Sequence, residues 1–218
     1  MPARLRPTAP IAADAVLVGD PGRALLLAQA LLEEPKMSNH ARGLWGYSGL
    51  TPAGDELSIQ ATGMGGPSAG LVLADLAELG VRRAIRVGTC TALDPELALG
   101  QLLAIAEAHA WGGGGTGASA LPDPELSARL RAKLGGEARV AAVASLDTLH
   151  GGGAPAPVGA AAADMQTAAL FERAGDLGVA LAAVLIVTES TSGEELSAEA
   201  GELSARRAGT AAANVLST

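Results

Sequence analysis

An arginine and a threonine stand three residues apart at the end of an apolar run, and these residue types could bind an anion. The run Ala84–Val87 is typical of a buried strand, and Gly88 with Thr89 predicts a tight turn after it. In an open α/β sheet, ligands bind beyond the carboxyl ends of the strands. There the planar guanidinium of Arg86 would offer a fork of donors suited to phosphate, and the Thr89 hydroxyl one more. An exposed arginine beside a turn threonine is the alternative.

A second basic residue follows an apolar run near the N-terminus. Ala15–Val18 predicts a buried strand, Gly19–Arg23 a tight turn and Ala24–Leu32 a helix. The turn would therefore stand at a helix N-terminus, where free backbone N–H groups and the helix dipole favour an anion. Arg23 would add a full positive charge there. A solvated arginine after an Asp-Pro-Gly turn is the alternative.

Glycines gather in Gly63–Gly70, between a predicted strand at Leu57–Thr62 and a helical pattern at Leu71–Leu79. This is not a dinucleotide-binding fingerprint, because Ser68 stands where the third glycine would be. It is not a P-loop either, because no lysine follows Gly70. The glycines would still let a ligand approach the backbone closely.

Length and composition predict one α/β domain. A chain of 218 residues is long enough for one such domain and short for two, and no change in composition divides it, so residues 1–218 are expected to form a single unit. Hydrophobic residues make up 49% of the chain but aromatic residues only 2%. The core must therefore be built from Ala, Val, Leu and Ile.

Charge and cysteine content argue against several classes of partner. The net charge of −8 disfavours nucleic acid, and the apolar windows are broken well short of the ~18 residues of a membrane span. The segment Met1–Pro10 lacks the apolar run of a signal peptide. A single cysteine, Cys90, cannot form an internal disulfide, which fits the reducing cytoplasm. His40 has no metal-binding partner near it in the sequence, so no metal site is predicted.

The rest of the chain alternates strands with helices. The expected elements are a strand-and-turn unit at Met37–Thr51, strands at Leu102–Ala108, Val140–Ser145 and Val179–Val187, and helices at Pro122–Leu134, Ala161–Gly175 and Glu194–Ser217. Two Gly-rich tracts, Gly112–Gly115 and Gly151–Pro157, predict loops. Such an alternation is typical of a mainly parallel sheet covered on both faces.

Five stretches of the chain, in order and at matching spacing, resemble one family. They are Gly19–Arg23, Ala41–Gly49, Gly63–Ser68, Arg86–Thr89 and Asp164–Leu170. Together they resemble the nucleoside phosphorylases of the purine and uridine type, a family that also includes the methylthioadenosine nucleosidases. The resemblance implies an α/β fold, a three-layer αβα sandwich with a mixed, mostly parallel twisted sheet. It also implies a homo-oligomer built from dimers, commonly a hexamer, with active sites at the dimer interface.

The resemblance also implies roles for single residues. The phosphate-binding residues would be Gly19, Arg23, Arg42, Arg86 and Thr89. Of these, Arg42 would reach into the phosphate site of the neighbouring subunit, and Arg86 would be catalytic.

The sugar and base sides of the site are assigned in the same way. Met165 would pack under the ribose, and Gln166 occupies the position of a glutamate that binds the ribose hydroxyls. Glu189 falls where the purine-type enzymes carry an aspartate that acts as an acid, so it is predicted to be catalytic. The region that stacks on the base corresponds to Thr148, Leu149 and His150.

The reaction implied is reversible phosphate-dependent cleavage of a nucleoside to a free base and (deoxy)ribose 1-phosphate. Inorganic phosphate is the co-substrate and no cofactor is predicted. Three arginines would hold the phosphate dianion in line, by positioning and electrostatics. Ser145–Thr148 and Thr89 resemble the uridine branch and Glu189 the purine branch, so uridine is slightly favoured over purine nucleosides.

Two alternatives remain open at this point. One is a nucleosidase on the same fold that uses water in place of phosphate, which the presence of three arginines disfavours. The other is a catalytically impaired protein that binds a nucleoside or phosphate. Gln166 motivates this second alternative, because a neutral amide lacks the charge and one of the acceptors of a carboxylate.

Overall fold

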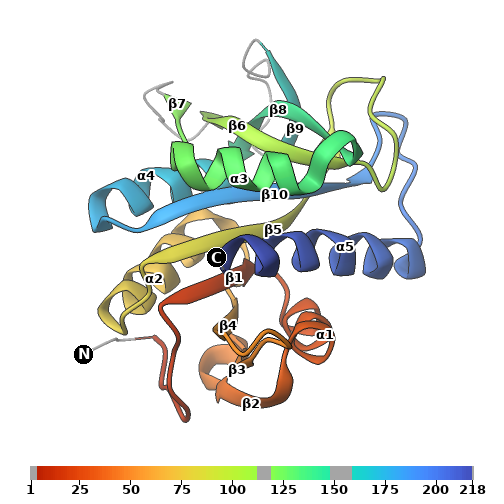
Figure 1. Ribbon diagram of the computed structural model, residues 1–218. Coiled ribbons are helices and arrows are strands. Elements are labelled where there is room, and N and C mark those ends of the chain that lie inside the picture. The colour runs from red at the N-terminus through yellow and green to blue at the C-terminus, as the bar shows by residue number, and fades with distance from the viewer. Residues whose placement is uncertain (1–3, 112–118, 148–158, 218) are drawn as a thin grey trace.

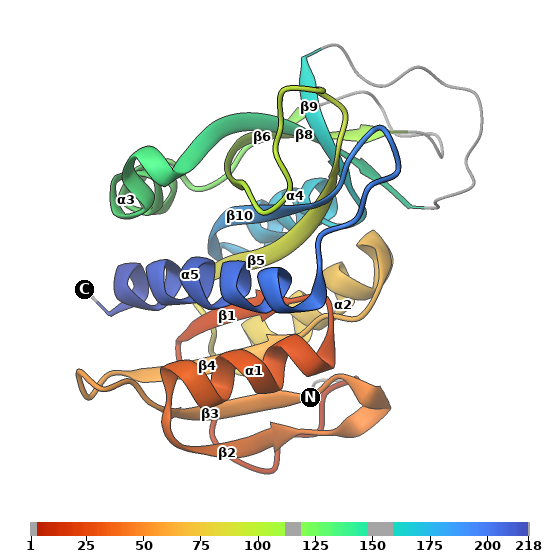
Figure 2. The same ribbon diagram turned by 90° about the vertical axis from the view of Figure 1, so that its right-hand side faces the viewer.

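A ten-stranded sheet with helices on both faces forms the body of the molecule (Figure 1, Figure 2). The computed structural model describes residues 4–111, 119–147 and 159–217. In chain order the elements are β1 (Asp14–Val18), α1 (Pro21–Leu31), β2 (Glu33–Asn39), the 3-10 helix η1 (Ala41–Gly43), β3 (Gly46–Leu50), β4 (Glu56–Ala61), α2 (Gly65–Glu78), β5 (Arg83–Ala92), β6 (Leu102–Trp111), β7 (Ser119–Ala120), α3 (Pro124–Leu134), the 3-10 helix η2 (Gly135–Glu137), β8 (Ala138–Leu146), β9 (Ala160–Asp164), α4 (Thr167–Leu177), β10 (Ala180–Glu189) and α5 (Ala198–Leu216).

Half of the sheet closes on itself. Strand β5 pairs with β10, β10 with β6, β6 with β8, β8 with β9, and β9 pairs again with β5. From β5 the strands β1, β4, β3 and β2 extend as an open wing. The long ladders β5–β10 and β6–β8 are parallel, whereas β2–β3, β3–β4, β6–β10 and β5–β9 are antiparallel. The predicted fold class, with helices on both faces of a mixed sheet, is confirmed, but the closure was not predicted.

Two apolar clusters, one on each face of the sheet, make the core. Strand β10 contributes to both, because successive side chains point to opposite faces. Leu185 belongs to the cluster with α2 and α4, and its neighbours Val184 and Ile186 belong to the cluster with α1, α3 and α5. Small residues let helices come close, since a Cβ at Gly209 of α5 would lie 2.7 Å from Leu27 Cδ2 of α1. This close approach of the helices helps to fill a core that has few aromatic side chains.

Two predicted elements were wrong. The segment Ala161–Gly175 is not one helix: its alanines form β9, and α4 begins only at Thr167. Helix propensity is overridden there because the segment pairs with β8 and β5 in the closed part of the sheet. The tight turn at Gly88 is also absent, because β5 continues to Ala92 along β10 and β9. The tracts Gly112–Gly115 and Gly151–Pro157 lie outside the described residues.

Within the described ranges, none of the helices combines the length and the apolar character needed to cross a membrane.

Candidate active site

The carboxyl ends of neighbouring strands bring together most of the residues that the sequence predicted to act. Strands β4, β1, β5 and β10 lie side by side and run parallel, so their carboxyl ends point the same way (Figure 2). The segment after β9 runs back along β5, since these two strands are antiparallel. Near this edge lie Gly19 after β1, Arg23 in α1, Arg86 and Thr89 in β5, Met165 and Gln166 after β9, and Glu189 at the end of β10.

Arg86 is buried and held by three acceptors that lie between the end of β9 and the start of α4. Its side chain shares the strand face of Ala84 and Cys90, toward α2 and α4. Its Nη2 bonds to Asp164 Oδ2 at 3.0 Å, its Nη1 to Gln166 Oε1 at 2.5 Å and its Nε to Thr167 Oγ1 at 3.2 Å. Only 4% of the residue is exposed. The guanidinium is therefore fixed in orientation before any ligand arrives.

Arg23 lies close enough to Arg86 for the two charges to interact. Burial lowers the pKa of Arg23, the carboxylate of Asp20 raises it, and the positive charge of Arg86 lowers it further. Asp20 is the N-cap of α1, and its side chain accepts from Arg23 N at 2.8 Å. Two arginines near a helix N-terminus could attract an anion, and anion binding here stays a prediction.

Gln166 links Arg86 to the turn that follows β4. Its Oε1 accepts from Arg86 and lies 3.0 Å from Thr62 Oγ1, whose one hydrogen is shared between Gln166 and Val18 O, also at 3.0 Å. Its Nε2 donates to the carbonyl oxygens of Gly63 at 2.6 Å and Gly65 at 3.4 Å. The residue is 3% exposed. Whether it also binds ribose hydroxyls stays a prediction.

A polar network around Asp164 was missed in the sequence. The Asp164 carboxylate accepts from Ser145 Oγ at 2.5 Å, from Thr167 Oγ1 at 2.6 Å and from Thr167 N at 3.1 Å, besides Arg86. Ser145 Oγ also accepts from Ala168 N at 3.0 Å. The only sign of this network in the sequence is that a polar residue, Asp164, ends a run of alanines. The network orients Arg86 and fixes the start of α4.

Glycine is required beside Arg86. A Cβ at Gly88 would lie 2.7 Å from Arg86 Cζ, 2.7 Å from its Nη2 and 2.7 Å from Leu185 Cδ2. Gly88 is thus needed for the room that the guanidinium takes, not for a turn. At Gly19 a Cβ would lie 3.9 Å from Gln166 Oε1, so the turn after β1 also borders this network.

The other predicted residues are spread further along the edge. Thr89 is half-buried and, three positions after Arg86, belongs to the opposite strand face. Met165 is half-buried beside Gln166. Glu189 is exposed and accepts from Thr91 Oγ1 at 2.8 Å. Thr91 stands five positions after Arg86 along β5, a distance of about 16 Å in an extended strand.

Arg42 stands apart from the other two arginines. It is exposed in η1 with a φ of 58°, and no hydrogen bond or ion pair of its side chain is found among the described residues. Asn39 holds this loop: its Nδ2 donates to Leu44 O at 2.5 Å and its Oδ1 accepts from Arg6 N at 2.8 Å. A cavity of about 390 Å³ opens there, lined by Arg6, Thr8, His40, Ala41 and Arg42.

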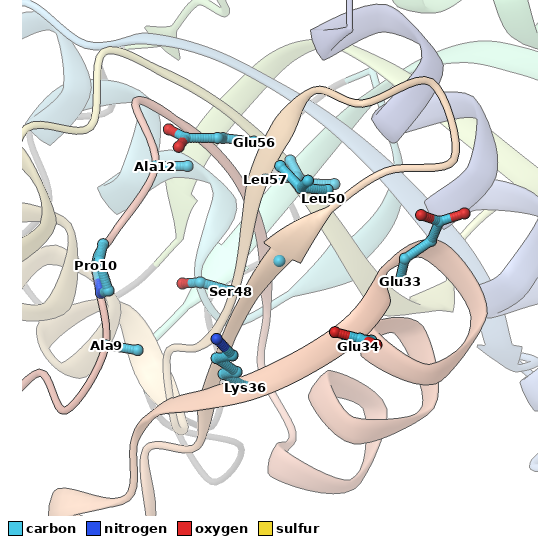
Figure 3. A pocket seen from close by; sticks show the side chains of 11 residues that line it. Ala9, Pro10, Ala12, Glu33, Glu34, Lys36, Ser48, Leu50, Glu56 and Leu57 are labelled. Carbon is cyan, nitrogen blue, oxygen red and sulfur yellow. The ribbon is translucent and has the colours of Figure 1, made fainter.

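A second cavity, of about 570 Å³, lies at the other end of β4 (Figure 3). It is lined by Ala9, Pro10, Ala12, Glu33, Glu34, Lys36, Ser48, Gly49, Leu50, Glu56 and Leu57. None of the predicted site residues lines it, so it is not part of the candidate active site.

The predicted base-binding residues Thr148, Leu149 and His150 lie outside the described residues. In the described part of the chain, no three His, Cys, Asp or Glu side chains gather as ligands of a metal ion.

Comparisons with known proteins point to one family. A model of the phosphorylase superfamily matches residues 14–218. The purine nucleoside phosphorylase DeoD-type of Caldanaerobacter subterraneus subsp. tengcongensis is 31% identical over 205 residues, which are 87% of this chain and 88% of that protein. The protein of the same name from Alkaliphilus metalliredigens is 33% identical over 210 residues, with the same shares. That of Oceanobacillus iheyensis is 44% identical over 88 residues, 40% of this chain and 37% of that protein.

The family match spans the strands and turns that carry Arg23, Arg86 and Gln166, and two relatives align over most of their own length. The chain belongs to the phosphorylase superfamily.

Proposed function

We propose that the protein catalyses the reversible, phosphate-dependent cleavage of purine nucleosides to a free base and (deoxy)ribose 1-phosphate. The observation that carries the proposal is that Arg86, on β5 beside β1, and Arg23, in the first turn of the helix that follows β1, lie at one edge of the sheet with their charges close enough to interact. The names of the relatives, purine nucleoside phosphorylases, support the choice of purine.

Phosphate binding by Gly19, Arg23, Arg86 and Thr89 would supply both position and charge. A phosphate oxygen attacks the anomeric carbon as the bond from that carbon to the base nitrogen breaks, and the electron pair of that bond leaves with the base. Arginines hold the dianion in line with the breaking bond and favour it near the developing cationic sugar. Phosphate is a co-substrate in this scheme, and arginine charge holds it without a cofactor.

The sugar and the base would extend from the phosphate toward the far end of β5 and β10. Met165, half-buried beside Gln166, would pack under the sugar. Glu189 would carry the proton that a purine ring nitrogen takes as the base leaves. Its carboxylate is kept oriented by Thr91.

The expected preference for uridine finds no support in the comparisons. Ser145, one of the residues on which it rested, is bonded to Asp164 and to the start of α4. A uracil leaving group needs donors to its carbonyl oxygens, whereas Glu189 offers a proton to a ring nitrogen. We therefore favour purine over uridine.

A measurement of base release distinguishes a phosphorylase from a nucleosidase and from a binding protein, and it also identifies the base. The protein is incubated with inosine, adenosine, uridine and thymidine, each with and without phosphate, and free base is measured. We expect release from inosine or adenosine that requires phosphate. Release that does not need phosphate would instead identify a nucleosidase, release from uridine alone would overturn the choice of base, and no release at all would leave a binding protein.

A second copy of the chain would complete the site. The Arg42 side chain is exposed and makes no hydrogen bond or ion pair with the described residues, and Arg6 and His40 line the same cavity. A cationic loop of this kind suits an anion bound by a neighbouring protomer. We propose a homo-oligomer built from dimers, commonly a hexamer in the family that the chain resembles, in which Arg42 reaches the neighbour's phosphate.

Mixed dimers test the role of Arg42. Arg23→Ala and Arg42→Ala should each remove most phosphorolysis, because each damages every site. In a mixed dimer, one site receives both substitutions and the other receives neither. Co-refolding equal amounts should therefore restore about a quarter of the wild-type activity. Failure of the mixture to exceed either variant alone would place Arg42 outside the neighbouring site.

A further inference from the structure

Asn39 is a buried amide that bonds to two separate segments, each of which carries an exposed arginine. The residue lies at the end of β2 and is completely shielded from solvent. Its Oδ1 accepts from Arg6 N at 2.8 Å, and its Nδ2 donates to Leu44 O at 2.5 Å and to Ala41 O at 3.3 Å. Arg6 belongs to the segment before β1, Arg4–Thr8, which we name the strap. Ala41 is in η1 and Leu44 follows it, so one side chain joins the strap to the loop around η1.

The strap is fixed to the body of the molecule on both sides of Arg6. The carboxylate of Asp75, buried on α2, accepts from Arg4 N at 2.6 Å and from Leu5 N at 2.9 Å. Leu5 is itself buried in the apolar cluster with α2 and α4. On the other side of Arg6, Thr8 N donates to a carbonyl group of β2 at 2.8 Å. The backbone of Arg6 is therefore held from both sides, besides the bond that its own N–H makes.

The backbone of Arg42 is held in a conformation that a residue with a side chain rarely adopts. Its φ of 58° and ψ of 20° lie in the left-handed region. Such strain persists where the surrounding contacts impose it. Here Leu44 O accepts from two buried amides, Asn39 Nδ2 and, at 2.9 Å, Gln60 Nε2. The loop around η1 is thus fixed to both β2 and β4, which fixes the backbone of Arg42.

Arg6 and Arg42 line one cavity, of about 390 Å³, together with Thr8, His40 and Ala41. None of these five residues is acidic, although the chain as a whole has a net charge of −8. Two like charges that share a cavity repel each other, so the anchored backbones are what keeps both of them there. The same two charges attract an anion that comes from outside the chain.

We propose that Asn39 is a positioning residue, which joins the strap and the loop around η1 into one preformed cationic surface. On this surface Arg6 adds a second positive charge to that of Arg42, for the phosphate of a neighbouring protomer. The proposal rests on the proposed function, in which Arg42 reaches that phosphate. The dianion then meets Arg23 and Arg86 of its own protomer and two cations of the neighbour. A preformed surface lowers the cost of binding, because the backbones that carry the two charges are ordered before phosphate arrives.

Two substitutions separate the two ties that Asn39 makes. Asn39→Ala removes all three hydrogen bonds, whereas Asn39→Asp keeps the acceptor for Arg6 N and loses both donors. Hydrogen–deuterium exchange is read at single residues by mass spectrometry. We expect Asn39→Ala to speed exchange about threefold or more at the amides of Arg6 and Leu44, and Asn39→Asp to do so at Leu44 only. Asn214→Ala, at an exposed position of α5, is the control and should change neither rate.

Mixing with Arg23→Ala tests whether Asn39 acts on the neighbouring site. In a mixed dimer of Arg23→Ala and Asn39→Ala, one site receives both defects and the other receives neither. Equal amounts refolded together should therefore restore about a quarter of the wild-type base release at limiting phosphate. A residue needed only for the folding of its own subunit leaves both sites of the mixed dimer damaged, and no activity returns.

The second charge has a test of its own. Arg6→Ala should raise the KM for phosphate about threefold or more, because one charged partner of the dianion is lost. Arg131→Ala, an exposed arginine of α3, is the control and should leave the KM unchanged. An unchanged KM in the Arg6 variant would overturn the role of this arginine.

Unchanged exchange at Arg6 in Asn39→Ala would overturn the tie to the strap, and a mixture no more active than its two variants alone would overturn action on the neighbour. If Asn39→Ala does not fold, Asn39→Asp replaces it in the mixture. The wild-type amide of Arg6 must then exchange about tenfold or more slower than in an unstructured peptide of the strap sequence. Wild-type protein without phosphate-dependent base release overturns the proposed function instead, and exchange alone then decides whether Asn39 joins the two segments.

Discussion

Arg86→Ala is expected to abolish phosphate-dependent base release and to lower the free energy of unfolding by about 3–5 kcal/mol. The rate falls because the buried guanidinium is the group on β5 that would hold phosphate. Stability falls because Asp164 would remain buried with its charge and without its cationic partner. Base release and urea denaturation measure the two effects.

A double variant separates catalysis from folding. Arg86→Ala with Asp164→Asn removes both charges, so most of the lost stability should return while activity does not. Arg131→Ala, an exposed arginine of α3, is the matched control and should change neither quantity. A double variant with restored activity would show that Arg86 acts on stability alone.

Gly88→Ala is expected to reduce kcat/KM for phosphate by about 10²-fold and to cost about 1–3 kcal/mol of stability. The new methyl group would meet Arg86 Cζ and Nη2 and also Leu185 Cδ2, each at 2.7 Å. The guanidinium cannot simply swing away, since three hydrogen bonds hold it. It must therefore move off its acceptors or push β10 outward.

Steady-state kinetics at varied phosphate and thermal unfolding test this second expectation. Gly175→Ala is a suitable control, because nothing lies within 4 Å of a Cβ there and the position is helical. It should keep full activity and equal or higher stability. Normal kinetics in the Gly88 variant would mean that the position of Arg86 is not critical.

The sequence was sufficient to predict that Arg23 and Arg86 lie at one edge of the sheet. Arg23 and Arg86 each follow or end a short apolar run, and in a parallel sheet the ends of such runs meet at one edge. That reasoning needs only local patterns and one rule of topology. It found the two arginines that the structure brings together.

The partners of Arg86 could not be predicted in the same way. Asp164 and Gln166 reach it across 78 and 80 residues of chain. Their contact depends on β9 being a strand, and an alanine-rich segment predicts a helix from local propensity. A helix over Ala161–Asp164 would give the aspartate at its end no reason to point at β5. The closure of the sheet depends on pairing between strands that are far apart in the sequence. It determines both that this segment is a strand and that Asp164 reaches Arg86.

That closure also sets the order in which the molecule can assemble as it leaves the ribosome. The wing and β5 use residues 14–92, and these are available early. Yet β5 pairs Arg83 with Ala180, so the sheet closes only after β10 has been made. Contacts so distant in sequence raise the contact order and slow folding. Until Asp164 has been made, Arg86 lacks its buried carboxylate partner and must stay hydrated, so the surroundings of Arg86 are among the last parts of the protein to lose their water.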